Sequence, residues 1–219
     1  MRDTLPPEVM MRSIVCAVVI ILAGSASSAL AQERQIGLKA GLNVASVKFE
    51  GDSSEGYDES RIGFLAGGFM VLPVTGPLAL QIEALFSQKG AQLSITEDNV
   101  EATLELDYLD FPVMLRFQGP ASGSTRLHFF GGPSMAFRMG ARSKLAYSGS
   151  SFTEGSIDNI EDDIEPFDFG IVAGGGVDIG RRIVIDARYS WGLSTINKDT
   201  SQGIEMKNRV FSILGGVRF

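Results

Sequence analysis

A chain of 219 residues is long enough for one domain, and its formal net charge of −7 offers a nucleic acid no positive surface, so we exclude a nucleic-acid-binding protein. Hydrophobic residues make up 44% of the chain, yet its 26 glycines and 14 phenylalanines are spread over short runs. This composition is typical of many strands joined by turns.

The N-terminal 31 residues are predicted to be a secretory signal peptide. An arginine precedes a ten-residue apolar run at residues 14–23, which is too short to cross a bilayer as a helix. Ala29 and Ala31 are the small residues expected before a cleavage site, so we predict cleavage after Ala31. Cys16 is the only cysteine, and its loss leaves a mature domain of residues 32–219 without a thiol, a disulfide or a cysteine metal site.

Eight segments of the remaining chain have apolar residues at every second position, which is the period of a strand with two unlike faces. Most segments are close to the length that a tilted membrane strand needs. In the fourth segment the apolar phase slips near Asp110 to Pro112, which suggests a β-bulge. The predicted strands are residues 36–44, 62–72, 78–86, 103–117, 127–139, 167–179, 183–193 and 209–219.

Long polar loops and short turns alternate between the predicted strands. In outer-membrane barrels the short turns face the periplasm and the long loops face outward, so both chain ends are expected on the periplasmic side. The predicted loops are residues 47–60, 87–101, 140–165 and 194–208, and the predicted turns are residues 73–77, 118–125 and 180–182.

Aromatic residues lie near both ends of the predicted strands, as the two interfaces of a membrane select. We therefore predict an all-β protein, an eight-stranded antiparallel up-and-down transmembrane β-barrel. A soluble ligand-binding barrel would share the strand period and stays an alternative. The aromatic residues toward the loops are Phe64, Phe86, Phe137, Phe167, Tyr189, Trp191 and Phe211, and those toward the turns are Phe117, Phe129 and Phe219.

The second face of the strands is rich in glycine and has few long charged side chains for a surface in water, so we assign it to the barrel interior. An eight-stranded barrel is just wide enough for its side chains to fill. We expect the interior charges to form ion pairs and hydrogen bonds and not to line a pore. Arg126 lies on this face. The predicted network consists of Lys39, Glu83, Arg116, His128, Arg138, Asp168, Asp178, Asp186, Arg188 and Arg218.

Three phrases of the sequence resemble a known family: YLDFPVMLR at residues 108–116, GLKAGLN at residues 37–43 and FGGPS at residues 130–134. They are similar to the PorT-like, or outer membrane protein beta-barrel domain, family of small OmpA/OmpX-like barrels. The resemblance implies an integral protein of the outer membrane in a Gram-negative-type cell envelope. The founding type is linked to protein secretion in gliding bacteria, a role that we do not transfer because these phrases are strand patterns.

The C-terminal strand ends on Phe219 after apolar residues at every second position. This ending resembles the signal that the outer-membrane assembly machinery recognises in a last strand. We expect that machinery, outer-membrane lipid and lipopolysaccharide as partners of a monomeric barrel.

Some small outer-membrane barrels are enzymes that act on lipid A or on peptides. His128 is the only histidine, and it is expected inside the barrel near a periplasmic turn, away from the outer leaflet where such barrels perform catalysis. Ser148, Ser150 and Ser151 lie in an outer loop without a histidine, so no serine triad is expected there. We predict no enzyme and no cofactor. A lipid-A-modifying or proteolytic enzyme is the alternative.

Carboxylates concentrate in two outer loops, at residues 50–59 and 158–165. They could bind divalent ions that bridge to lipopolysaccharide phosphates, or they could keep the loops soluble. Their spacing fits no calcium-binding loop, so we expect solvated loops and no metal site. The sequence thus predicts a structural or surface-interaction protein of the outer membrane without an open pore.

Overall fold

The computed structural model describes residues 34–50, 59–95, 100–147, 154–155, 160, 164–198 and 205–219. The predicted signal peptide and its cleavage site lie outside the described residues. In the described part of the chain no helix is long and apolar enough to cross a membrane. The strands are β1 (Gln35–Glu50), β2 (Glu59–Thr75), β3 (Leu78–Ile95), β4 (Val100–Ser122), β5 (Thr125–Tyr147), β6 (Glu154–Gly155), β7 (Phe167–Ile179), β8 (Ile183–Gly192) and β9 (Glu205–Arg218).

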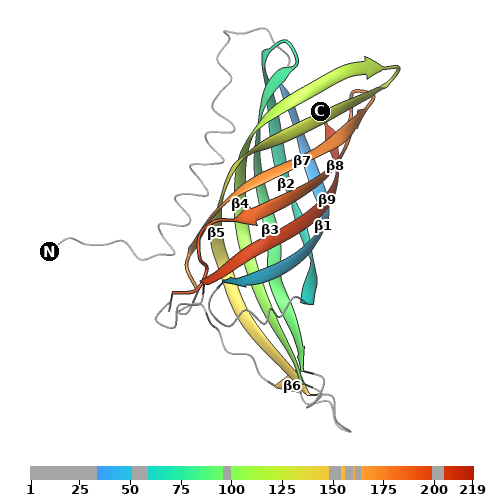
Figure 1. Cartoon of the computed structure of the whole chain (residues 1–219). Helices are drawn as coiled ribbons and strands as arrows, with labels where there is room; N and C mark the ends of the chain where they lie inside the picture. The colour runs from blue at the N-terminus through green and yellow to red at the C-terminus, as the bar shows by residue number, and fades with distance from the viewer. Residues whose placement is uncertain are drawn as a thin grey trace, which may run out of the picture. The chain divides into compact units, whose positions relative to one another are not determined.

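Eight of these strands close into one antiparallel barrel (Figure 1). Neighbours in sequence pair from β1 to β5 and from β7 to β9, while β5 pairs with β7. β1 pairs with β9 along most of its length, which completes the ring. Among the described residues, β6 pairs with the end of β5 alone. The predicted fold class, an eight-stranded antiparallel β-barrel, is confirmed.

Three short turns join the strands at one end of the barrel. Each contains a glycine in the left-handed region: Gly76 has φ 51°, Gly123 has φ 61° and Gly180 has φ 60°. Glycine occupies this region without the steric cost of a Cβ atom, so it suits these tight reversals. The turn predicted at residues 118–125 is shorter in the structure, because β4 and β5 continue through most of it.

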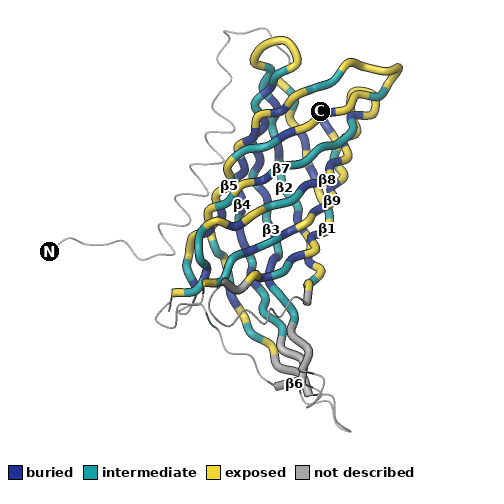
Figure 2. Tube along the Cα trace, viewed as in Figure 1, coloured by how far each residue is buried: buried dark blue, intermediate teal, exposed yellow. Residues whose placement is uncertain are grey.

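A belt of exposed apolar residues surrounds the barrel. Buried and exposed positions alternate along the strands of the wall (Figure 2). In β1 the even-numbered residues from Ile36 to Val44 face outward, and the residues between them face inward. Burying this much apolar surface in lipid is favourable, whereas exposing it to water is not. The belt is the surface expected of a barrel that spans a membrane.

The side chains of β4 alternate regularly through the region of the predicted bulge. Every second residue from Leu106 to Arg116 is buried, including both Asp110 and Pro112. The bulge predicted at Asp110 to Pro112 is therefore wrong. The register between β4 and β5 shifts instead at Asp107 and Tyr108, which is nearer the loop end of the strand.

The apolar phase of β4 slips because the surroundings of its two faces exchange near Tyr108. On the turn side, apolar residues such as Leu115 face outward into the belt. On the loop side, the outward positions are polar, whereas the inward residues Leu106 and Tyr108 are apolar and buried. β3, β4 and β5 therefore continue as strands beyond the belt, into residues predicted as loops at 87–101 and 140–165.

An ion-pair cluster lies on the outer face of this extension, where the strands are expected to be in contact with water. Glu105 lies 2.9 Å from Lys144 Nζ and 3.1 Å from Arg61 Nη2. Partial burial raises the pKa of Glu105, but the hydrogen bond from Lys144 and the two positive charges outweigh it, so the pKa is lowered from its ordinary value. Such charges fit a strand surface outside the hydrocarbon layer.

Candidate functional site

A network of buried ion pairs lies in the turn half of the barrel interior around Glu83 of β3. One carboxylate oxygen lies 2.8 Å from Lys39 Nζ, and the other lies 2.6 Å from Arg188 Nη1. Gln81 donates a hydrogen bond of 2.6 Å to Glu83 Oε1, and Lys39 also pairs with Asp186. Residues far apart in sequence meet here because the inward positions of all strands converge on a narrow lumen.

His128 of β5 links this network to a second group of charges. Its Nε2 atom lies 2.7 Å from Asp186 Oδ1, and its Nδ1 atom lies 3.4 Å from Asp178 Oδ1. Arg116 Nη2 donates to both oxygens of Asp178 at 2.7 Å, and Arg218 Nη2 lies 2.9 Å from Asp178 Oδ1. All five side chains are buried. The imidazole therefore hydrogen-bonds the carboxylate of Asp186 on β8 and lies beside the carboxylate of Asp178 on β7, while its Nδ1 atom has no hydrogen-bond partner in the described structure.

Most of the predicted interior residues meet in this network, and two lie elsewhere. Asp168 is buried in a separate cluster nearer the loops. Arg138 is half-buried, and among the described residues it has no ion-pair partner. Arg126 is exposed at the turn end of β5. The predicted residues that meet are Lys39, Glu83, Arg116, His128, Asp178, Asp186, Arg188 and Arg218.

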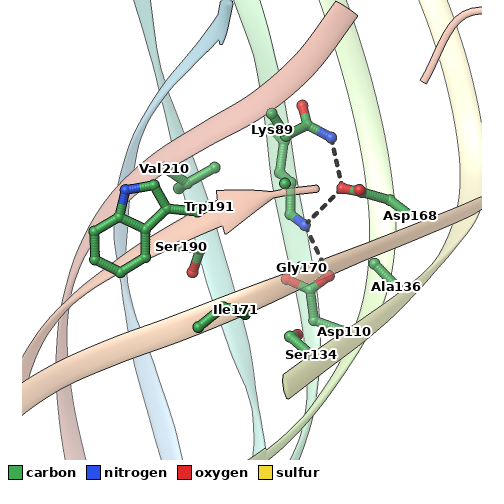
Figure 3. A pocket seen from close by; sticks show the side chains of 12 residues that line it. Lys89, Asp110, Ser134, Ala136, Asp168, Gly170, Ile171, Ser190, Trp191 and Val210 are labelled. Carbon is green, nitrogen blue, oxygen red and sulfur yellow. Dashed lines mark hydrogen bonds and ion pairs between the residues drawn. The ribbon is translucent and has the colours of Figure 1, made fainter. Parts of the chain in front are cut away.

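The second cluster is centred on Lys89 of β3, which reaches between two carboxylates (Figure 3). Its Nζ atom lies 3.0 Å from Asp110 Oδ1 and 3.8 Å from Asp168 Oδ2. Asn208 donates a hydrogen bond of 2.8 Å to Asp168 Oδ2. The ring of Tyr108 covers the ammonium group at 4.7 Å from the ring centroid, a cation–π contact.

A small cavity beside Lys89 measures about 20 Å³. Asp110, Asp168, Ser134 and Ser190 are among its lining residues. The volume corresponds to about one water molecule, which excludes a sugar or a peptide from this part of the interior.

A cluster of buried apolar residues, here called the plug, lies on the loop side of Lys89. Its buried members come from strands and also from the connections around β7 and β8: Ile164 and Ile196 are 4% and 0% exposed. Ile164 also forms a β-bridge with Asn197, which ties the two connections together. The plug consists of Val47, Leu106, Tyr108, Ala136, Ala141, Ile164 and Ile196.

Lys89 and Asp110 are interior charges that the sequence prediction missed. Lys89 falls within a predicted loop, and Asp110 falls on the predicted phase slip. Both continue the inward alternation of their strands, which for β3 runs through Glu83, Leu85 and Ser87. Strand parity could have identified both residues. The alternation has to be continued beyond the last apolar outward position of each strand.

The interior chemistry is ion pairing and hydrogen bonding. In the described part of the chain no group of three or more histidine, cysteine or acidic residues could hold a metal ion. His128 contacts two carboxylates. Most of the acidic positions at 50–59 and 158–165 lie outside the described residues, as do Ser148, Ser150 and Ser151.

The comparisons with known proteins identify one family. The model of the family described as "Outer membrane protein beta-barrel domain" matches residues 29–198. The search of curated proteins found no significant match.

Several solved structures are similar to this chain at low sequence identity. Ail, the attachment invasion locus protein of Yersinia pestis, is 15% identical over 86% of this chain and 100% of its own, with a TM-score of 0.45. OprG from Pseudomonas aeruginosa is 10% identical over 84% and 95%, with a TM-score of 0.46. Neisserial surface protein A is 12% identical over 85% and 97%, with a TM-score of 0.43.

Proposed function

This chain belongs to the outer membrane protein β-barrel domain family, and we propose that it is a plugged, non-enzymatic barrel of structural or surface-interaction type. Its interior holds the barrel together, and its contacts with other molecules are made by the outer loops and the lipid-facing belt. Outer-membrane lipid, lipopolysaccharide and the assembly machinery are the partners that we propose for a monomeric protein.

The filled interior is the observation that carries this proposal. The ion-pair network occupies the turn half of the lumen, the cluster of Lys89 follows it, and the plug around Ile164 and Ile196 lies beyond. The cavity beside Lys89 has room for about one water molecule. A solute could pass only if buried ion pairs and packed apolar side chains separated, which is costly.

Conductance of the refolded protein in planar bilayers tests the absence of an open pore. We expect no steady single-channel current and no uptake of small sugars in a liposome-swelling assay. A mixture containing a known porin serves as the positive control for both measurements. Steady conductance by the wild-type protein would refute the plugged barrel.

Activity assays on lipid A and on peptides test the absence of catalysis. His128 is buried between Asp178 and Asp186, so we expect the wild-type protein and the His128→Ala variant to be equally inactive. Turnover by the wild-type protein that His128→Ala abolishes would favour the enzyme alternative.

The soluble ligand-binding barrel is not proposed, because its outer surface would have to meet water and the belt of this barrel is apolar. The PorT-like subgroup rests on the phrases at residues 37–43, 108–116 and 130–134. Those phrases lie on β1, β4 and β5, where they supply wall and interior residues. They support the barrel family and give no reason to propose a role in secretion.

A further inference from the structure

The exposed charged side chains at the turn end of the barrel have one sign. Its three turns are described in full, and residues 73–77, 118–125 and 180–182 contain no lysine and no carboxylate side chain. The exposed charged residues of the described chain at this end are all arginines: Arg34, Arg126, Arg181 and Arg182. This is the opposite of the net charge of the whole chain, which is −7.

Two further arginines lie just inside the mouth of the lumen and share a single carboxylate. Arg116 and Arg218 are both buried, and both pair with Asp178. The Nε atom of each is buried and has no hydrogen-bond partner within the described structure. Arg126 lies directly opposite Asp178 in the register of β5 and β7, and it acts on Arg218 by like-charge repulsion.

The arginine side chains at this mouth carry more positive charge than the one carboxylate side chain of Asp178 can neutralise. Neither Arg126 nor Arg182 forms an ion pair with a residue that the structure describes; Arg126 only donates a hydrogen bond to Gln118, at 3.2 Å. The backbone oxygen of Arg182 accepts a hydrogen bond of 2.7 Å from Arg218, so this arginine belongs to the same rim. Crowded cations with unpaired donors favour an anion as the missing partner.

The height of these arginines in the membrane indicates which anion is available. Arg126 precedes Leu127, and Arg182 precedes Ile183; both apolar side chains are exposed at the edge of the belt. The two arginines therefore follow directly on the edge of the belt, where the hydrocarbon layer is expected to end and the headgroups begin. Short turns of outer-membrane barrels face the periplasm, so this level is that of the inner, phospholipid leaflet.

We propose that Arg126 and Arg182, supported by Arg116 and Arg218, bind the phosphodiester headgroup of an anionic phospholipid at the periplasmic mouth of the barrel. The planar guanidinium fork matches two oxygens of a phosphate, which a lysine cannot do. This inference concerns the end of the barrel opposite the outer loops; it names a site for the lipid partner of the proposed function and rests on the membrane location proposed there.

The test measures lipid selectivity of the refolded full-length protein. Spin-labelled phosphatidylglycerol and phosphatidylcholine are compared by electron paramagnetic resonance in reconstituted bilayers. We expect the wild-type protein to prefer phosphatidylglycerol, and we expect the double variant Arg126→Gln/Arg182→Gln to lose that preference several-fold. Both side chains are exposed, so the variant should fold; heat-modifiable migration on a gel verifies this, and the single variants replace it if it does not.

Arg142→Gln is the matched control. Arg142 is exposed at the loop end of the same strand, β5, and has no ion pair with a described residue. The control should keep the wild-type selectivity. The proposal is overturned if the double variant keeps its preference, if Arg142→Gln loses it equally, or if inorganic phosphate at the same concentration removes it. The last result would show a site for free phosphate and not for a lipid.

Discussion

At the scale of single residues, Glu83 shows how a charge is accommodated inside the barrel wall. Its side chain is fully buried and accepts hydrogen bonds from Lys39, Arg188 and Gln81. A buried carboxylate is tolerated only when its charge is compensated and its oxygens are occupied. Both conditions hold for Glu83. We therefore expect the negative charge of Glu83, and not the shape of its side chain, to determine its effect on the free energy of unfolding.

We expect Glu83→Gln to lower the free energy of unfolding by about 3–5 kcal/mol, because it keeps the shape of the side chain and leaves buried cations under-compensated. Arg188 then has no carboxylate partner among the described residues. Urea unfolding of the protein refolded in phospholipid vesicles measures this loss.

Removing both partners provides the control for that prediction. Glu83→Leu combined with Arg188→Met takes away the opposite charges together and fills the space with apolar groups, so much of the stability should return. A double variant that is no more stable than Glu83→Gln would contradict an electrostatic role for the pair.

The sequence was sufficient to predict the inward direction of these charges but not which of them meet. Parity along one strand says which side of the wall a residue faces. Whether Lys39 meets Asp186 depends on the register and stagger of strands that are far apart in sequence. Arg138 illustrates the limit: its parity predicts the interior, but it is only half-buried and has no ion pair in the described structure.

At the scale of strands, the eight alternating segments predicted the barrel, whereas the strand ends could not be predicted from apolar periodicity. A strand that leaves the membrane loses its apolar outward face, so its periodicity weakens while its hydrogen bonding continues. β3, β4 and β5 extend into predicted loops for this reason. The slip of the apolar phase at Asp110 to Pro112 results from this exchange of surroundings. The register shift lies at Asp107 and Tyr108 instead.

Two positions on the outer face of β4 test this boundary. Leu115 is 55% exposed within the belt, so Leu115→Arg places a charge in hydrocarbon and should cost about 2–4 kcal/mol. Thr103 lies opposite the exposed Lys144 beyond the belt, so Thr103→Arg should cost at most about 1 kcal/mol.

Urea unfolding in vesicles compares the two variants on one strand. Equal costs would show that the proposed edge of the belt between Leu115 and Thr103 is misplaced. A large cost for both variants in detergent micelles as well would point to a packing defect and not to lipid exposure.

At the scale of the whole molecule, the barrel exists only when β1 and β9, the two ends of the described chain, pair along most of their lengths. The last residue contributes little to that closure. Phe219 donates one backbone hydrogen bond of 2.9 Å to Ile36, and its side chain is 82% exposed. Its ring therefore makes few packing contacts in the folded protein. Removing the ring should thus change recognition during assembly without changing the stability of the folded barrel.

Phe219→Ala tests the predicted assembly signal on that basis. The free energy of unfolding in vesicles should change by no more than about 0.5 kcal/mol, as for surface substitutions. In cells, the heat-modifiable, folded fraction should fall, because the terminal ring is the part that the assembly machinery is proposed to bind. Phe117→Ala, at an exposed aromatic position of the same belt edge on β4, is the control and should assemble normally. Equal assembly of both variants would mean that Phe219 is only a lipid-facing side chain.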